Sequence, residues 1–220
     1  MTTAIFEPDG QLALQEANHR FLNTLAALGG FLRRDFGAFV DPAISDAVSV
    51  FSGRIQAFAC VHRTLGEDHD EALVDAPAYL AKLCAELCAA HLAPRGLYCE
   101  FRSDPGVLSR EACQTLGLIV VELLTNAAEH SFVGRRSGRI CVSLRRAEAA
   151  WICQVADNGS GLRGTGKGDG MKLVRKLARA MGGDLRVHSD ASGLIVTLRL
   201  WDPPFSPGVM VHAATAQHHA

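Results

Sequence analysis

The first third of the chain carries a helical hydrophobic pattern that two isolated helices could not cover. From Phe21 to Leu32, apolar residues recur every three or four positions, which is typical of one buried helix face. After a turn at Asp41-Pro42, the same spacing returns and continues to Leu65. A two-helix hairpin cannot bury its apolar stripe alone. We therefore expect it to be covered either by a second copy of the chain, as a four-helix bundle, or by the rest of the chain.

The remainder of the chain mixes helix-like and strand-like segments. Helices are predicted at residues 76–92, 109–129 and 169–181, the second beginning at an N-cap serine, Ser109. Strands are predicted at residues 97–102, 139–145, 151–156, 184–188 and 193–200. Because adjacent strands follow each other without an intervening helix, the pattern indicates an α+β sandwich. The expected division is a hairpin at 1–70, a second domain at 71–201 and a mobile tail at 202–220, with a polar linker at Glu67–Leu73.

Composition excludes several classes of protein. The 220 residues are 48% hydrophobic and 20% charged with a net charge of −1, which is typical of a globular chain and not of a nucleic-acid binder. The N-terminus has no signal-peptide pattern, and no segment approaches the roughly 20 apolar residues of a membrane span. Seven cysteines lie singly in apolar segments, as reduced, buried thiols do. We expect a soluble, cytoplasmic protein that binds neither nucleic acid nor membrane.

Two segments carry oxygen ligands in a pattern that suits a magnesium–nucleotide complex. Glu122 and Asn126 are four residues apart, so both side chains project from one helix face and offer hard oxygen atoms to Mg²⁺. Asp157 leaves a strand into Asn-Gly-Ser-Gly, where residues without side chains allow a flat ring to approach. An acceptor-only carboxylate suits the exocyclic amine of adenine. A glycine run at 164–170 then opens onto a helix N-terminus, which favours phosphate.

These segments resemble the N box and the two glycine boxes of the GHKL ATP-binding domain, in the order found in bacterial sensor histidine kinases. The His19-Arg20-x-x-Asn23 pattern, the Arg54–Leu65 segment and Val74–Leu80 extend the resemblance to the HisKA_2 subgroup and its HWE relatives. The resemblance covers roughly residues 16–200. It implies a dimerisation hairpin that carries the phosphoacceptor histidine, followed by a GHKL (Bergerat-type) α/β sandwich.

The resemblance implies a role for each site residue. His19 is the expected phosphoacceptor, which takes the γ-phosphoryl group of ATP and passes it to an aspartate on a response-regulator receiver domain. Asn126, with Glu122, is expected to hold Mg²⁺, and Asp157 to bind adenine. The pocket and its lid are expected to be shaped by four glycines: Gly159, Gly161, Gly168 and Gly170.

The chain also departs from the family pattern. Leu22 and Glu129 stand where many members carry a basic residue, and the lid is short, so a cation near the phosphates is expected from Lys172 or its neighbours. Arg20 stands where other kinase groups place an acidic residue, and Glu16 is the expected substitute that orients the His19 ring. Only about ten residues precede the first helix, so input is expected from a separate sensor protein, from an upstream region, or not at all.

Other interpretations remain open at this point. The chain could be a catalytically weak scaffold that retains the kinase fold, or a serine kinase of the anti-sigma type. Residues 159–164 satisfy the dinucleotide pattern G-x-G-x-x-G, but too many glycines intervene before the helix for a Rossmann unit. Cys84, Cys88 and His91 share one helix face, although no fourth metal ligand is evident.

Overall fold

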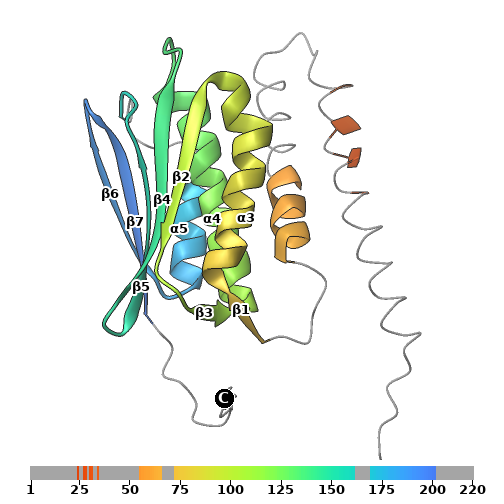
Figure 1. Cartoon of the computed structure of the whole chain (residues 1–220), viewed down its shortest axis with the longest axis vertical. Coiled ribbons are helices and arrows are strands. Elements are labelled where there is room, and N and C mark those ends of the chain that lie inside the picture. Colours follow the sequence, from red (N-terminus) through yellow and green to blue (C-terminus); the bar gives the residue numbers. More distant parts are fainter. Residues whose placement is uncertain are drawn as a thin grey trace, which may run out of the picture.

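The architecture is a five-stranded mixed sheet with helices packed on one face (Figure 1). The computed structural model describes residues 55–65, 72–161 and 169–201, together with helical positions 24, 27, 28, 30, 31 and 34. Over these residues the predicted α+β fold class is confirmed. The hairpin turn, the first 23 residues and the predicted tail at 202–220 lie outside the described residues, so the four-helix bundle remains a prediction.

The helices and strands follow the predicted order, with bounds that differ by a few residues. They are β1 (Leu73–Asp75), α3 (Ala76–Leu87), the π-helix η1 (Cys88–Leu92), the 3₁₀-helix η2 (Ala93–Arg95), β2 (Leu97–Ser103), β3 (Val107–Ser109), α4 (Arg110–Asn126), the π-helix η3 (Ala127–Ser131), β4 (Gly138–Ala147), β5 (Ala150–Asp157), α5 (Asp169–Ala180), β6 (Asp184–Asp190) and β7 (Gly193–Trp201). Within the described ranges, none of the helices combines the length and the apolar character that crossing a membrane requires.

Two short strands were not predicted. β1 and β3 pair antiparallel, with Leu73 opposite Ser109, so the polar linker predicted at Glu67–Leu73 gives way to a strand at its last residue. Each of these strands ends at the N-cap of a helix. Asp75 Oδ1 accepts a hydrogen bond from the backbone of Ala78 at 2.9 Å, and Ser109 Oγ, as predicted, accepts from Ala112 at 3.1 Å. The two-stranded ribbon therefore sets the starting points of α3 and α4 together.

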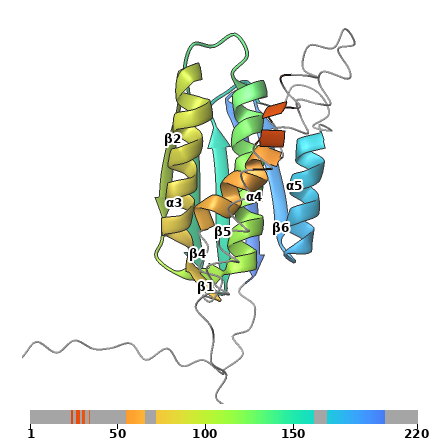
Figure 2. The ribbon, with the colours of Figure 1, turned by 90° about the vertical axis from the view of Figure 1, so that its right-hand side faces the viewer.

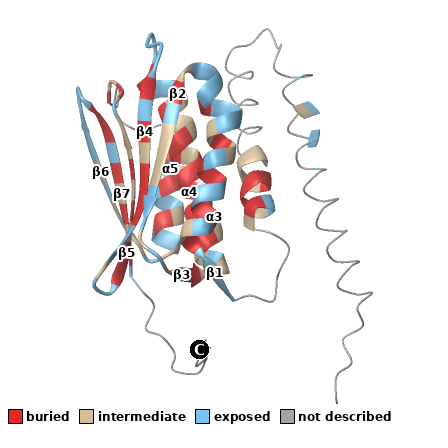
Figure 3. Cartoon of the chain, viewed as in Figure 1, coloured by how far each residue is buried: buried red, intermediate tan, exposed pale blue. Residues whose placement is uncertain are grey.

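The sheet has the order β2-β4-β5-β7-β6, in which only β2 and β4 run parallel. Side chains alternate between its two faces, and buried residues concentrate on the face that α3, α4 and α5 cover (Figure 3). The register places Asp157 opposite Ile140 on one side and Leu194 on the other, both of which are buried. Asp157 is therefore the last residue of β5 on the helix-covered face.

Part of the predicted hairpin packs on the sheet domain itself. The helix at residues 55–65 lies against α3 and α4 on the side away from the sheet (Figures 1 and 2). Val61 is fully buried beside Gly117 of α4, and a ring nitrogen of His62 lies 2.8 Å from the Gln114 side-chain nitrogen. Of the two ways to cover the hairpin's apolar stripe, the rest of the chain covers this segment.

Candidate nucleotide site

Glu122, Asn126 and Gly170 meet where the end of α4 faces the start of α5. A Cβ atom built on Gly170 would lie 2.8 Å from both Oδ1 and Nδ2 of Asn126, and closer still to a Glu122 carboxylate oxygen. A Cβ atom there would displace the ends of both side chains, so the glycine allows Glu122 and Asn126 to reach this point on α5. The prediction that Glu122 and Asn126 share one helix face is confirmed, because both side chains reach the same point on α5. Their roles toward a metal stay predictions.

Asp157 is held by donors from two different segments. Ser131 Oγ donates a hydrogen bond to Asp157 Oδ2 at 3.0 Å, and the backbone N–H of Gly159 donates to Oδ1 at 2.8 Å. A Cβ on Gly159 would lie 2.8 Å from that same Oδ1 and would overlap the Ser131 backbone. The group that closely approaches this glycine is the protein's own π-helix η3, and the predicted approach of a flat ring stays a prediction.

The turn after Asp157 is tied to β4 and to the segment that precedes it. Asn158 accepts a hydrogen bond on its side chain from the backbone of Arg139 at 2.8 Å, and its own N–H donates to the Arg139 carbonyl at 3.1 Å. The guanidinium of Arg135 donates to the Asn158 carbonyl at 2.6 Å. The polar groups of this exposed residue are therefore used to fix the turn that follows Asp157.

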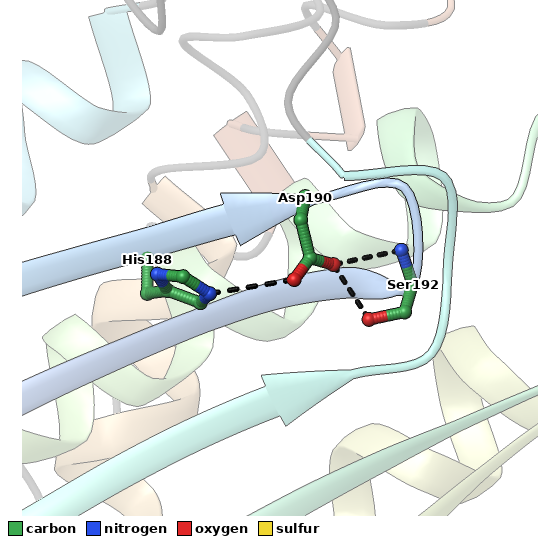
Figure 4. Close-up of polar contacts among 3 residues, drawn as sticks. All are labelled: His188, Asp190 and Ser192. Atoms are coloured by element: carbon green, nitrogen blue, oxygen red, sulfur yellow. Dashed lines mark hydrogen bonds and ion pairs between the residues drawn. The ribbon is translucent and has the colours of Figure 1, made fainter.

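The β6–β7 turn supports the glycine segment from the other side. Gly161 has a positive φ of 70°, and a Cβ there would lie 2.8 Å from Ser189 Oγ and closer to the Asp190 carbonyl. Asp190 fixes this turn, since its carboxylate accepts from the Ser192 backbone at 2.8 Å and lies 3.4 Å from His188 Nε2 (Figure 4). The hydrogen bonds from Ser192, and more weakly the contact with His188, hold the pKa of Asp190 below its usual range.

The remaining predicted site residues are placed less closely. Lys172 is exposed on α5, two residues beyond Gly170, so it points to a different side of the helix from the one that contacts Asn126. Glu129 is exposed in η3 and lines an open depression of about 360 Å³ with Arg95 and Arg135. Three predicted site residues lie outside the described residues: Glu16, His19 and Gly168.

The cysteines are mostly buried thiols of the hydrophobic core. All seven are free, and four of them are buried. Burial raises the pKa of both Cys113 and Cys153 to about 12, so these two thiols stay protonated at neutral pH. The prediction of buried thiols holds for these, whereas Cys88, Cys99 and Cys141 are only half-buried. His91, the third member of the considered metal edge, is exposed.

Sequence reasoning missed the two groups that support Asp157 and the glycine turn. Ser131 lies five residues beyond Asn126. Its place just after the predicted helix was the only signal for it, and this signal did not indicate a role. Ser189–Ser192 lies between two predicted strands, but its contact with Gly161 depends on strand pairing that links distant segments.

The residues fit a magnesium–nucleotide complex on their chemistry. One carboxylate and one carboxamide, Glu122 and Asn126, leave most of the coordination shell to phosphate oxygens and water, as Mg²⁺ usually requires. The N-terminus of α5 lies beside them, and the first backbone N–H groups of a helix have no partner within it and favour phosphate. Asp157, at the end of β5, offers the remaining acceptor positions of its carboxylate to a purine amine.

Comparisons with known proteins point to one family. The chain matches the histidine kinase model HisKA_2 over residues 16–91 and the model of histidine kinase-, DNA gyrase B- and HSP90-like ATPases over residues 113–204. It is 26% identical to blue-light-activated histidine kinase 2 of Erythrobacter litoralis over 204 residues, which cover 87% of this chain and 57% of that protein. It is also 26% identical to the sensor histidine kinase PdtaS of Mycolicibacterium smegmatis over 188 residues, 82% of this chain and 37% of that protein.

The structure agrees with a solved one. The histidine kinase domain of the Erythrobacter litoralis EL346 blue-light-activated kinase superimposes with a TM-score of 0.63 at 20% identity, covering 81% of this chain and 95% of that one. At this identity the likeness shows the fold. The chain spans 57% and 37% of the lengths of the two kinases it matches in sequence.

Proposed function

The chain belongs to the HisKA_2-type histidine kinases, which carry a GHKL ATPase domain, and from this we propose that it autophosphorylates His19 from Mg-ATP and passes the phosphoryl group to an aspartate of a response-regulator receiver domain. The observation that carries the proposal is the convergence of Glu122 and Asn126 on Gly170. That convergence brings two side chains with oxygen donors to the start of a helix, within the same domain as Asp157.

The proposed reaction forms a bond between a His19 ring nitrogen and the γ-phosphorus while the bond to the bridging oxygen of ADP breaks. Phosphoryl transfer of this kind depends on positioning and charge stabilisation. A bound Mg²⁺ would neutralise charge on the phosphate oxygens. Asn126 and Glu122 would hold that ion, and the α5 N-terminus would bind the phosphate oxygens. Asp157 would orient the base, so that the triphosphate points toward the two helices.

The roles of Glu16, Lys172 and Gly168 belong to the same proposal. Glu16 precedes His19 by three residues, which would be about one turn on the predicted helix, and would accept a hydrogen bond from its ring. Lys172 would supply a cation near the phosphates, and Gly168 would belong to the lid over them. We also propose the domain division at residues 70 and 201, although the helix at 55–65 shares the core of the second domain.

The partners follow from the proposed reaction. A receiver domain accepts the phosphoryl group, a second copy of the chain pairs with the hairpin, and a separate sensor protein or further sequence supplies the input. We propose a cytoplasmic location, which is supported by the seven free cysteines. We propose no nucleic-acid or membrane partner for the function itself.

The test is incubation of the full chain with γ-labelled ATP and Mg²⁺. We expect acid-labile label on the protein, its loss in His19→Gln, and its retention in the control His91→Gln, which changes an exposed histidine far along the chain. Transfer is then tested against a panel of purified receiver domains, each paired with its aspartate-to-asparagine variant. Acid-stable label would contradict the proposal and favour a serine kinase.

A catalytically weak scaffold is the second candidate, and the position of Glu129 favours it. This exposed carboxylate follows Asn126 by three residues and adds negative charge beyond the end of α4, where a phosphate would be disfavoured. Binding of a nucleotide without any label on His19 would support the scaffold. If Glu129→Lys then restored label, the loss would be assigned to this one charge.

A further inference from the structure

We propose that Ser131 is a positioning residue for base recognition, which holds the Asp157 carboxylate in the orientation that accepts a hydrogen bond from the exocyclic amine of adenine. The inference rests on the proposed function, because it takes Asp157 as the adenine ligand. It adds a residue that no sequence motif singled out and gives that residue a measurable effect on the choice between adenine and guanine.

The geometry leaves Asp157 little freedom. Ser131 is 4% exposed, and its hydroxyl donates to one carboxylate oxygen of Asp157 at 3.0 Å while the Gly159 N–H donates to the other at 2.8 Å. Each oxygen thus has one donor from the protein. A carboxylate has about four lone-pair positions, so both oxygens keep capacity for a ligand. Among the residues that the structure describes, removal of the Ser131 hydroxyl would leave only the Gly159 contact and would free the carboxylate to rotate.

Ser131 lies at the end of a helix and is itself held by hydrogen bonds to Ser160. The last carbonyl groups of a helix have no partner within it. The Ser131 carbonyl accepts from the Ser160 N–H at 2.9 Å and from the Ser160 hydroxyl at 3.3 Å. The same continuous helical segment carries Asn126 five residues earlier. One segment therefore supplies the proposed magnesium ligand and the group that orients the proposed adenine ligand.

This arrangement predicts a selective effect. Adenine presents an amine, N6–H₂, where guanine presents the carbonyl oxygen O6. A correctly oriented carboxylate attracts the first and repels the second. Loss of the Ser131 donor should weaken adenine binding and leave guanine binding nearly unchanged, because guanine gains nothing from Asp157 in either case.

The experiment measures dissociation constants of fluorescent, non-hydrolysable ATP and GTP analogues for the full chain with Mg²⁺. For Ser131→Ala we expect about a tenfold loss of ATP-analogue affinity, the size of one lost hydrogen bond to a charged group, and a change within twofold for the GTP analogue. Ser131→Cys nearly keeps the volume but donates weakly, so its affinity for the ATP analogue should lie between those of the wild-type protein and Ser131→Ala. The matched control is Ser143→Ala, at a buried serine on β4 away from the site, which should match the wild-type protein.

In a kinase assay, the KM for ATP should rise in Ser131→Ala while kcat at saturating ATP stays within twofold of the wild-type value. Equal losses for both analogues in Ser131→Ala and Ser131→Cys, or unchanged affinity in both, would overturn the inference. Asp157→Asn separates it from the proposed function. If Asp157→Asn abolishes the adenine preference while both Ser131 variants keep it, only the role of Ser131 fails. If Asp157→Asn keeps the preference, the proposed roles of Asp157 and Ser131 both fail, whereas the label on His19 remains the separate test of kinase activity.

Discussion

The two ends of the proposed nucleotide site are built in different ways. At the base end, Asp157 is held by hydrogen bonds from Ser131 and Gly159, and the turn that follows is tied to neighbouring segments. At the cation end, Glu122 and Asn126 are brought to one point by close contact with Gly170. Hydrogen bonds define the orientation of Asp157, the proposed base ligand, whereas contact between two helices brings together Glu122 and Asn126, the proposed metal ligands. The base end should therefore be sensitive to the loss of a hydrogen-bond donor, and the cation end to an added methyl group between the helices.

The largest effect is expected from Asn126→Ala at the cation end. Changes to groups that merely support metal ligands cost about 10-fold to 100-fold, so loss of a direct ligand should lower autophosphorylation by about 100-fold or more. The nucleotide's base should still bind, so affinity for adenosine is expected to stay within threefold. The measurement is label incorporation with a magnesium titration. Full activity at ordinary magnesium would contradict the assignment.

The next effect is expected from Gly170→Ala, which changes only volume. The added methyl group would overlap the ends of the Glu122 and Asn126 side chains, so both proposed metal ligands must move. A misplacement of about 1 Å can cost about 100-fold in rate, and we expect a loss of between 10-fold and 100-fold in kcat/KM. Lys176→Ala, at an exposed position of the same helix, is the control and should behave as the wild-type protein. If Gly170→Ala kept full activity, packing could not be what places the metal ligands.

A smaller effect is expected from Gly159→Ala at the base end. Its methyl group would overlap the Ser131 backbone and press on Asp157, and such overpacking costs about 1–3 kcal/mol in the free energy of unfolding. We expect about a tenfold loss of ATP-analogue affinity. Gly134→Ala is the control for a loss of stability without a steric contact, since Gly134 has a φ of 78° but open space around it. Gly134→Ala should lower stability and leave nucleotide affinity unchanged. Equal losses of affinity in both variants would argue against a specific contact at Gly159.

The smallest effect concerns the β6–β7 turn and depends on pH. The pKa of Asp190 lies below its usual value of about 3.9, chiefly because of Ser192. Ionised Asp190 therefore stabilises the fold at any pH above that usual value, and this contribution disappears as the pH falls through the lowered pKa. Asp190→Asn should be less stable than the wild-type protein at pH 6, with the difference vanishing toward pH 2. Urea unfolding at several pH values measures this. A constant difference across the range would exclude the ionised carboxylate as the cause.

Much of the fold could be predicted because the signals are local. Apolar spacing predicted α4 and α5, and alternation predicted β4, β5, β6 and β7, since each pattern reflects a single face of a single element. Capping chemistry predicted the start of α4 at Ser109. The strands β1 and β3 were missed because three residues are too few to show alternation, and their pairing links segments about 35 residues apart. The covering of the helix at 55–65 was left open for a similar reason, because an apolar stripe does not say what lies opposite it.

The sequence by itself determined the chemistry of the site: which residues carry carboxylate, carboxamide or imidazole groups, and which positions must lack a side chain. It also determined that Glu122 and Asn126 share a face, because helix geometry is fixed within a single turn. Only the tertiary structure decided that this face meets Gly170 and that Ser131 donates to Asp157. Those contacts join residues 26 or more positions apart, and their geometry depends on how α4, α5 and the sheet pack together, which no local pattern encodes.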